Sequence, residues 1–261
     1  MKTGKMLVKV LFFGMLRDLV GHSEQELKIA DDACLKTVFD HYALLHPQLR
    51  KMSSSVLLAH NQKFATPDTT LSDGDEVAFM PPVSGGTTGG VLPLDDTDQD
   101  PVIPFLKWVR DKRGFYGLTH HPINVDALKQ QVASSRAGAL LTFEGVVRDN
   151  SCKRRTFYLD YDCYVPLALR TMQRLGHEVL QKNEIEAIAI VHRIGRLEIG
   201  EASVVITISA AHRQVAYKAS LEAINKLKKT VPVWKKEYFE DGEIWVGGEL
   251  DVRLSNKDQK I

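Results

Sequence analysis

The chain has 261 residues, of which 44% are hydrophobic and 26% charged. This length suits one large or two ordinary domains, and the composition is typical of a globular protein with a hydrophobic core. A formal net charge of +1 does not favour a general nucleic-acid-binding surface. The three cysteines form no CxxC pair, so we expect neither a disulfide framework nor a metal site. We expect a cytoplasmic protein with no membrane partner, because the sequence has no apolar run near ~20 residues and no recognisable signal peptide.

The first eighty residues predict a small domain of the β-grasp type. A helix is expected over 35–51, where apolar residues recur every three or four positions, and residues 15–21 read as a short connection. A turn is expected at Asn61-Gln62. The expected strands are at 6–13, 24–29, 56–59, 63–65 and 76–80. The order strand, strand, helix, strand, strand indicates one helix packed on a mixed sheet.

A tail follows the last of these strands directly, with the sequence Pro81-Pro82-Val83-Ser84-Gly85-Gly86. It begins stiff, because proline fixes φ, and it ends in two residues without side chains. This shape suits a carrier protein whose terminal carboxylate enters a narrow active site. An ordinary Pro/Gly linker is the alternative, and the position after a β-grasp pattern favours the carrier. An internal Gly86 has no free carboxylate, so either the chain is cut there or the carrier chemistry is lost.

The remaining sequence predicts a linker and a second domain. Residues 87–104 are rich in aspartate and proline, which is typical of an exposed linker. The domains are therefore expected at 1–86 and 105–261. The expected helices are at 123–132, 167–180 and 215–227, and the expected strands are at 139–143 (buried), 156–161, 185–193, 202–209 and 244–247. Strands and helices alternate without a strict βαβ rhythm, so the chain as a whole is expected to be α+β.

Basic residues of the second domain stand at the ends of expected elements rather than in runs. They are Arg148, His212-Arg213, Lys228-Lys229 and Lys235-Lys236. Strand ends and helix starts collect anionic ligands, and arginine binds phosphate through two parallel hydrogen bonds. A small phosphorylated substrate would suit this set. A plainer interpretation stays open for Lys228-Lys229 and for His212. Lysines stabilise a helix C-terminus through its dipole, and a lone histidine is more often a capping or packed residue.

Both halves resemble subunits of the molybdopterin synthase family. Residues 6–86 resemble its small, ubiquitin-like sulfur-carrier subunit, which ends in the same kind of PPV-x-GG tail. Residues from about 115 to 250 resemble its large, catalytic subunit. The matching stretches are TFEGVVR (142–148), LDYDCY (159–164), VHRIG (191–195), SAAHR (209–213) and LKKTVPVWKKE (227–237). The family often has an arginine after the late Trp245-Val246 pair, whereas this chain continues Gly247-Gly248-Glu249.

The resemblance implies sulfur transfer to cyclic pyranopterin monophosphate, which builds the dithiolene of molybdopterin. Sulfur would be carried as a thiocarboxylate on Gly86, made by an adenylating and sulfurating enzyme, and no other cofactor is expected. Lys228 and Lys235 fall on the catalytic positions, with Lys228 nearest the carrier terminus and Arg213 expected close to both. The positions that the resemblance assigns to substrate binding are Phe143, Arg148, His212, Arg213 and Glu237.

The fusion of two subunits adds a further expectation. We expect a maturation protease to cut after Gly86 rather than after Gly89-Gly90, with the products staying associated. We also expect a homodimer through the C-terminal domain, as the family's large subunit forms. One alternative is an uncleaved, inactive or regulatory chain whose β-grasp domain only docks. A second alternative is an enzyme that uses the same basic pocket for another phosphorylated heterocycle.

Overall fold

The structure is a computed structural model that describes residues 5–83, 106–151 and 153–246. The chain divides into two compact units, Met1–Pro82 and Val83–Ile261. The predicted domain end at Gly86 and the predicted linker at 87–104 lie outside the described residues. No helix in the described part of the chain is long and apolar enough to cross a membrane.

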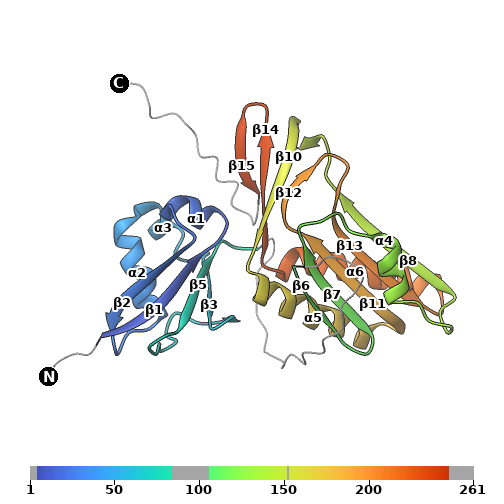
Figure 1. Cartoon of the computed structure of the whole chain (residues 1–261), viewed down its shortest axis with the longest axis horizontal. Helices are drawn as coiled ribbons and strands as arrows, with labels where there is room; N and C mark the ends of the chain where they lie inside the picture. Colours follow the sequence, from blue (N-terminus) through green and yellow to red (C-terminus); the bar gives the residue numbers. More distant parts are fainter. Residues whose placement is uncertain (1–4, 84–105, 152, 247–261) are drawn as a thin grey trace. The chain divides into compact units, whose positions relative to one another are not determined.

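The first unit is a five-stranded mixed sheet with helices (Figure 1). Its elements are β1 (Lys5–Phe12), α1 (Met15–Val20), β2 (Glu24–Ala30), α2 (Leu35–Leu45), α3 (Pro47–Lys51), β3 (Leu57–His60), β4 (Lys63–Phe64) and β5 (Glu76–Met80). The strand order is β2-β1-β5-β3-β4, with β1 and β5 parallel and the other neighbours antiparallel. The predicted β-grasp fold is confirmed.

Two local predictions for this unit are wrong. Residues 15–20 form the helix α1 rather than a plain connection, because Leu16 and Val20 are buried one turn apart and Gly21 ends the helix with φ 89°. The single helix expected over 35–51 is two helices. Pro47 starts the second one, since proline cannot donate a backbone hydrogen bond within a continuing helix.

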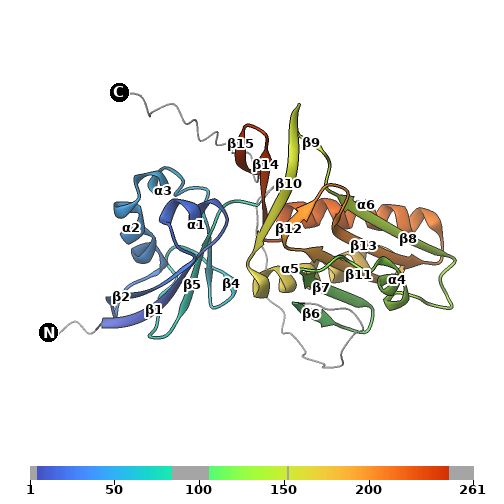
Figure 2. The same ribbon diagram turned by 45° about the horizontal axis from the view of Figure 1, so that its top comes forward.

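The second unit contains two sheets and three helices among its described residues (Figures 1 and 2). Its elements are β6 (Lys107–Arg110), β7 (Gly114–Thr119), α4 (Val125–Gln131), β8 (Ala139–Val146), β9 (Asn150–Ser151), β10 (Arg154–Cys163), α5 (Val165–Lys182), β11 (Ile185–Arg193), β12 (Gly195–Glu198), β13 (Ala202–Ala210), α6 (Arg213–Thr230), β14 (Val233–Phe239) and β15 (Gly242–Val246). One sheet has the order β6-β7-β11-β13-β8, and the other has the order β12-β10-β14-β15 with β9 paired to β10.

The first of these sheets is covered on both faces. Apolar residues that alternate along β11 and β13, such as Ile188 and Ile206, pack in one cluster with α5 and α6. Their neighbours on the opposite face, such as Ala189 and Val205, pack in another cluster with Leu128 of α4. The prediction of an α+β fold is confirmed for the chain as a whole.

The sequence reading missed five strands of this unit, namely β6, β7, β9, β12 and β14. It also expected residues 139–143 to be a buried strand, whereas β8 lies at the end of its sheet and alternates between partly buried and exposed residues. Leu140, for example, is exposed. An edge strand such as β8 has a hydrogen-bonded neighbour on one side only. Its apolar composition therefore does not imply that both of its faces are buried.

Candidate active site

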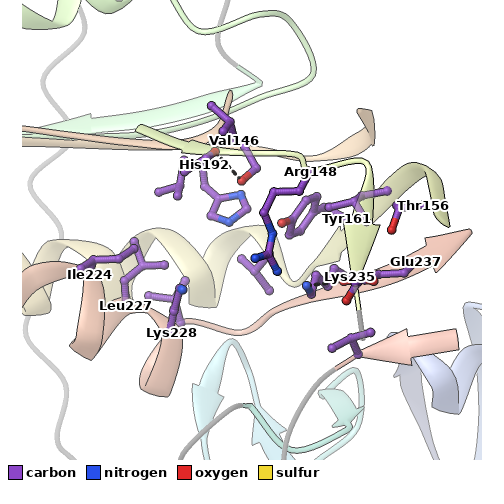
Figure 3. A pocket seen from close by; sticks show the side chains of 18 of the residues that line it. Val146, Arg148, Thr156, Tyr161, His192, Ile224, Leu227, Lys228, Lys235 and Glu237 are labelled. Atoms are coloured by element: carbon purple, nitrogen blue, oxygen red, sulfur yellow. Dashed lines mark hydrogen bonds and ion pairs between the residues drawn. The ribbon is translucent and has the colours of Figure 1, made fainter. Parts of the chain in front are cut away.

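The second unit encloses a pocket of about 540 Å³, which suits a small-molecule ligand. Its lining comes from strands β8, β9, β10, β11, β13, β14 and β15 and from the C-terminal end of α6 (Figure 3). Both sheets of the unit therefore contribute to it. In the described ranges 5–83, 106–151 and 153–246, no three His, Cys, Asp or Glu residues are grouped as a metal site requires.

Three predicted basic residues reach this pocket from three separate places in the chain. Arg148 follows β8, Lys228 is in the last turn of α6, and Lys235 lies on β14. Figure 3 shows the Arg148 guanidinium pointing toward the Lys235 side chain. Three cations around one cavity favour an anionic ligand such as a phosphate or a carboxylate.

Strand β14 decides which of the two neighbouring lysines faces the pocket. Lys235 and Glu237 are two residues apart, so their side chains lie on the same face, and both line the pocket. Lys235 Nζ donates to Glu237 Oε1 over 2.5 Å. Lys236 does not line the pocket and instead forms an ion pair with Glu243 of β15. Its ammonium also lies 5.6 Å from the ring centroid of Trp245.

At the end of α6, too, only one of two neighbouring lysines lines the pocket. Leu227, which is 5% exposed, lines the pocket, as does the adjoining Lys228. Lys229 is exposed and does not line it. A helix C-terminus carries partial negative charge, which stabilises an ammonium group there. The helix therefore presents Lys228 alone of this pair to a ligand.

The wall formed by β8 requires a residue without a side chain. Phe143 and Gly145 of this strand both line the pocket. A Cβ atom on Gly145 would lie 2.7 Å from Val204 Cγ1 on the paired strand β13. Ser203 Oγ donates to the Gly145 carbonyl over 2.9 Å. Glycine thus leaves room for the Val204 side chain just before Arg148.

Two residues that the sequence reading did not single out also line the pocket, His192 and Tyr161. Their rings meet edge to face with centroids 5.0 Å apart. His192 Nδ1 lies 2.7 Å from the Arg193 carbonyl, so Nδ1 donates and Nε2 is left as an acceptor. Burial lowers the pKa of His192 to about 4, which the Arg193 carbonyl only partly opposes. His192 is therefore neutral at physiological pH.

The remaining predicted site residues lie elsewhere. His212 and Arg213 are exposed at the N-terminal end of α6. Lys228 is fifteen residues further along the same helix (213 to 228), about 22 Å at 1.5 Å per residue. Arg213 thus does not approach Lys228 in one copy of the chain, and the expected proximity is wrong. Gly86 lies outside the described residues.

Comparisons with known proteins identify the family. The profile of the MoaE protein matches residues 118–230, and that of the ThiS family matches residues 10–86. The molybdopterin synthase catalytic subunit of Bacillus subtilis (strain 168) is 44% identical over 137 residues, which are 52% of this chain and 87% of that protein. The chain belongs to the molybdopterin synthase catalytic subunit family. The predicted resemblance, a carrier-like domain joined to a catalytic-subunit domain, is confirmed.

Other relatives cover a similar part of the chain. The molybdopterin synthase catalytic subunit of Sclerotinia sclerotiorum is 40% identical over 151 residues, 56% of this chain and 77% of that protein. The crystal structure of molybdopterin synthase from Staphylococcus aureus is 37% identical and covers 50% of this chain and 95% of that chain, with a TM-score of 0.48.

The buried, neutral His192 predicts a pH dependence of stability. The unfolded chain binds a proton near the ordinary histidine pKa of 6.5, whereas the folded protein binds it only near pH 4. Protonation between these values favours unfolding, so His192 should reduce stability by about 3 kcal/mol as the pH falls from 7 to 4. Urea denaturation of the second unit at pH 7 and 4.5 should show a smaller loss in His192→Gln than in the natural chain.

His121 supplies a matched control, because it is an exposed histidine of the same unit. His121→Gln should keep the full loss of stability at low pH. An equal loss in the natural chain and in His192→Gln would contradict the assignment of a depressed pKa to His192.

Proposed function

We propose that this chain is a molybdopterin synthase in which the sulfur carrier and the catalytic subunit are encoded together. It transfers sulfur from a thiocarboxylate on Gly86 to cyclic pyranopterin monophosphate and so forms the dithiolene of molybdopterin. The observation that carries the proposal is the convergence of Arg148, Lys228 and Lys235 on one pocket within a domain of this family. Both reactants are anions, and three cations around a cavity favour the binding of both.

Each of the three cations has a distinct task in this proposal. Arg148 binds the substrate phosphate, because a guanidinium matches phosphate oxygens with two parallel donors. Lys228, at the exposed end of α6, receives the carrier terminus and stabilises charge on sulfur. Lys235, held by Glu237, positions substrate and transfers protons to it. Phe143 forms an apolar wall against the heterocycle. The scheme uses no metal and no redox cofactor.

The carrier half needs a free carboxylate on Gly86. As an internal residue Gly86 has an amide carbonyl, which cannot be adenylated and then thiolated. We therefore propose hydrolysis of the Gly86-Thr87 bond by a protease, after which an adenylating and sulfurating enzyme acts on Gly86. The match to the ThiS family supports this position, because it ends at residue 86. The two products stay associated and act as one synthase in the cytoplasm.

His212 and Arg213 fit this function only if two copies of the chain associate. The two residues cannot reach the pocket of their own copy, because the length of α6 separates them from Lys228. Strand β8 and helix α6 each carry exposed apolar side chains. They are Leu140 (49% exposed), Val146 (52%), Tyr217 (63%) and Leu221 (63%). We propose a homodimer in which His212 and Arg213 serve the pocket of the second copy.

The catalytic role of Lys228 can be tested with a close control. Lys228→Ala should lower the rate of molybdopterin formation about 10²–10³-fold, the range expected when a group that stabilises charge in the transition state is removed. The assay supplies cyclic pyranopterin monophosphate and thiocarboxylated carrier, and measures dithiolene formation. Lys229→Ala changes the adjoining exposed lysine and should stay within about twofold of the natural rate. Equal rates in both variants, with the fold retained, would contradict the role of Lys228.

Cleavage after Gly86 can be tested by blocking it. Proline at position 87 removes the amide N–H and fixes φ, which most proteases do not accept after the scissile bond. In the protein's own organism, Thr87→Pro should keep the chain at full length and abolish molybdopterin formation. Separate chains 1–86 and 87–261 should restore it. A Thr87→Pro chain that stays intact and still supports molybdopterin synthesis would refute the cleavage proposal.

A further inference from the structure

Two buried polar atoms of the pocket have no hydrogen-bond partner among the described residues. They are Glu237 Oε2 and Thr156 Oγ1, on residues that are 2% and 3% exposed. Leaving a buried polar atom unpaired destabilises the protein, and does so more strongly when the group is charged. Both residues line the pocket, so a bound ligand can supply the missing partners.

The pairing of β10 with β14 puts these two residues on the pocket side of the same sheet. Leu159 lies opposite Glu237, and Thr156 lies opposite Phe239. The register shifts between Thr156 and Tyr158, so one extra residue is accommodated there. Without this irregularity Thr156 and Leu159, which are three residues apart, would face opposite sides of the sheet. The bulge therefore turns Thr156 toward the pocket, beside Leu159.

The chemistry of these atoms differs from that of the rest of the pocket. Glu237 Oε1 already accepts from Lys235, and Oε2 remains as an acceptor that repels a phosphate. Figure 3 shows Lys228, Arg148 and Lys235 at the left and centre of the pocket, and Glu237 with Thr156 at the right. One side thus favours an anionic group, and the other requires a neutral group with N–H donors.

We propose that Glu237 Oε2 and Thr156 Oγ1 form a subsite for the donor edge of the substrate's heterocycle. This inference rests on the proposed function and adds to it the means of recognising the ring. A 2-amino-4-oxopyrimidine, the outer ring of a pterin, presents an amino group and an adjoining ring N–H on one edge. These are the kinds of donors that a carboxylate and a hydroxyl accept. The opposite charge preference of the two sides then orients the molecule, with phosphate toward Arg148.

The test compares two probes that differ at one position of this edge. Neopterin monophosphate carries the 2-amino group, and its lumazine counterpart carries a 2-oxo group, which accepts rather than donates. Calorimetric titration of the full chain should show at least about tenfold tighter binding of the pterin, because a hydrogen bond to a charged group is involved. Glu237→Gln should reduce that preference to within about twofold, since a glutamine amide can also donate to the 2-oxo group.

Two further variants complete the design. Thr156→Val should weaken binding of the pterin probe about 3–10-fold, the effect of one lost hydrogen bond. Glu243→Gln is the matched control, because Glu243 also pairs with a lysine of β14 but on the face away from the pocket. It should keep the full preference for pterin. The readout is the ratio of the affinities for the two probes, because a change that weakens the binding of both probes equally leaves this ratio unchanged.

Each outcome decides the proposal. A Glu237→Gln chain that keeps the natural preference overturns the subsite, while molybdopterin formation by the natural chain would leave the proposed function standing. If Glu237→Gln fails to fold, Thr156→Val carries the test, and unchanged pterin affinity in that variant overturns the subsite. A natural chain that binds both probes equally, or neither, overturns it as well. The molybdopterin assay on the same preparation then shows whether the proposed function fails too.

Discussion

The pocket depends on the antiparallel pairing of β10 with β14. This pairing places Tyr161 opposite Lys235 and brings Glu237 to the same face. Because side chains alternate along a strand, it also sends Lys236 to the opposite face, where it pairs with Glu243. A slip of one residue would exchange the two lysines and remove the carboxylate from the pocket. The strand register therefore decides which charges a ligand meets.

A second constraint comes from the length of α6. The helix holds Lys228 at one end and His212 with Arg213 at the other, so one copy of the chain cannot bring all three to one ligand. Family resemblance places all of them in a single site. All three residues can serve one ligand only if the site is shared between copies of the chain. Self-association is then part of the proposed catalytic unit.

Much of the fold followed from the sequence because its signals are local. The alternating strands of the β-grasp domain and the turn at Asn61-Gln62 are of this kind, and both turn residues have the positive φ that such a turn requires. The helix α1 was missed because six residues are too few to show a helical period. Strand β14 was missed because its middle is a run of charged residues, and only its neighbours β10 and β15 make it a strand.

The candidate site was predictable to a similar degree. Motif positions led to Phe143, Arg148, Lys228, Lys235 and Glu237, which all line the pocket. His192 was overlooked because it stands in a run of aliphatic residues in β11, where nothing in the sequence marks it as facing a cavity. The unpaired oxygens of Thr156 and Glu237 could not be foreseen either. They depend on a β-bulge and on burial, and both are properties of the assembled sheet.

The proposed function depends most on one peptide bond. A carrier and its acceptor pocket lie in a single chain, and the carrier has a usable terminus only if Gly86 and Thr87 are separated. The decisive measurement is the intact mass of the protein isolated from its own organism while it makes molybdopterin. We predict two associated polypeptides, the smaller ending at Gly86, whose masses together equal the 29.3 kDa chain plus one water. A single uncut chain in cells that rely on it for molybdopterin would contradict the account.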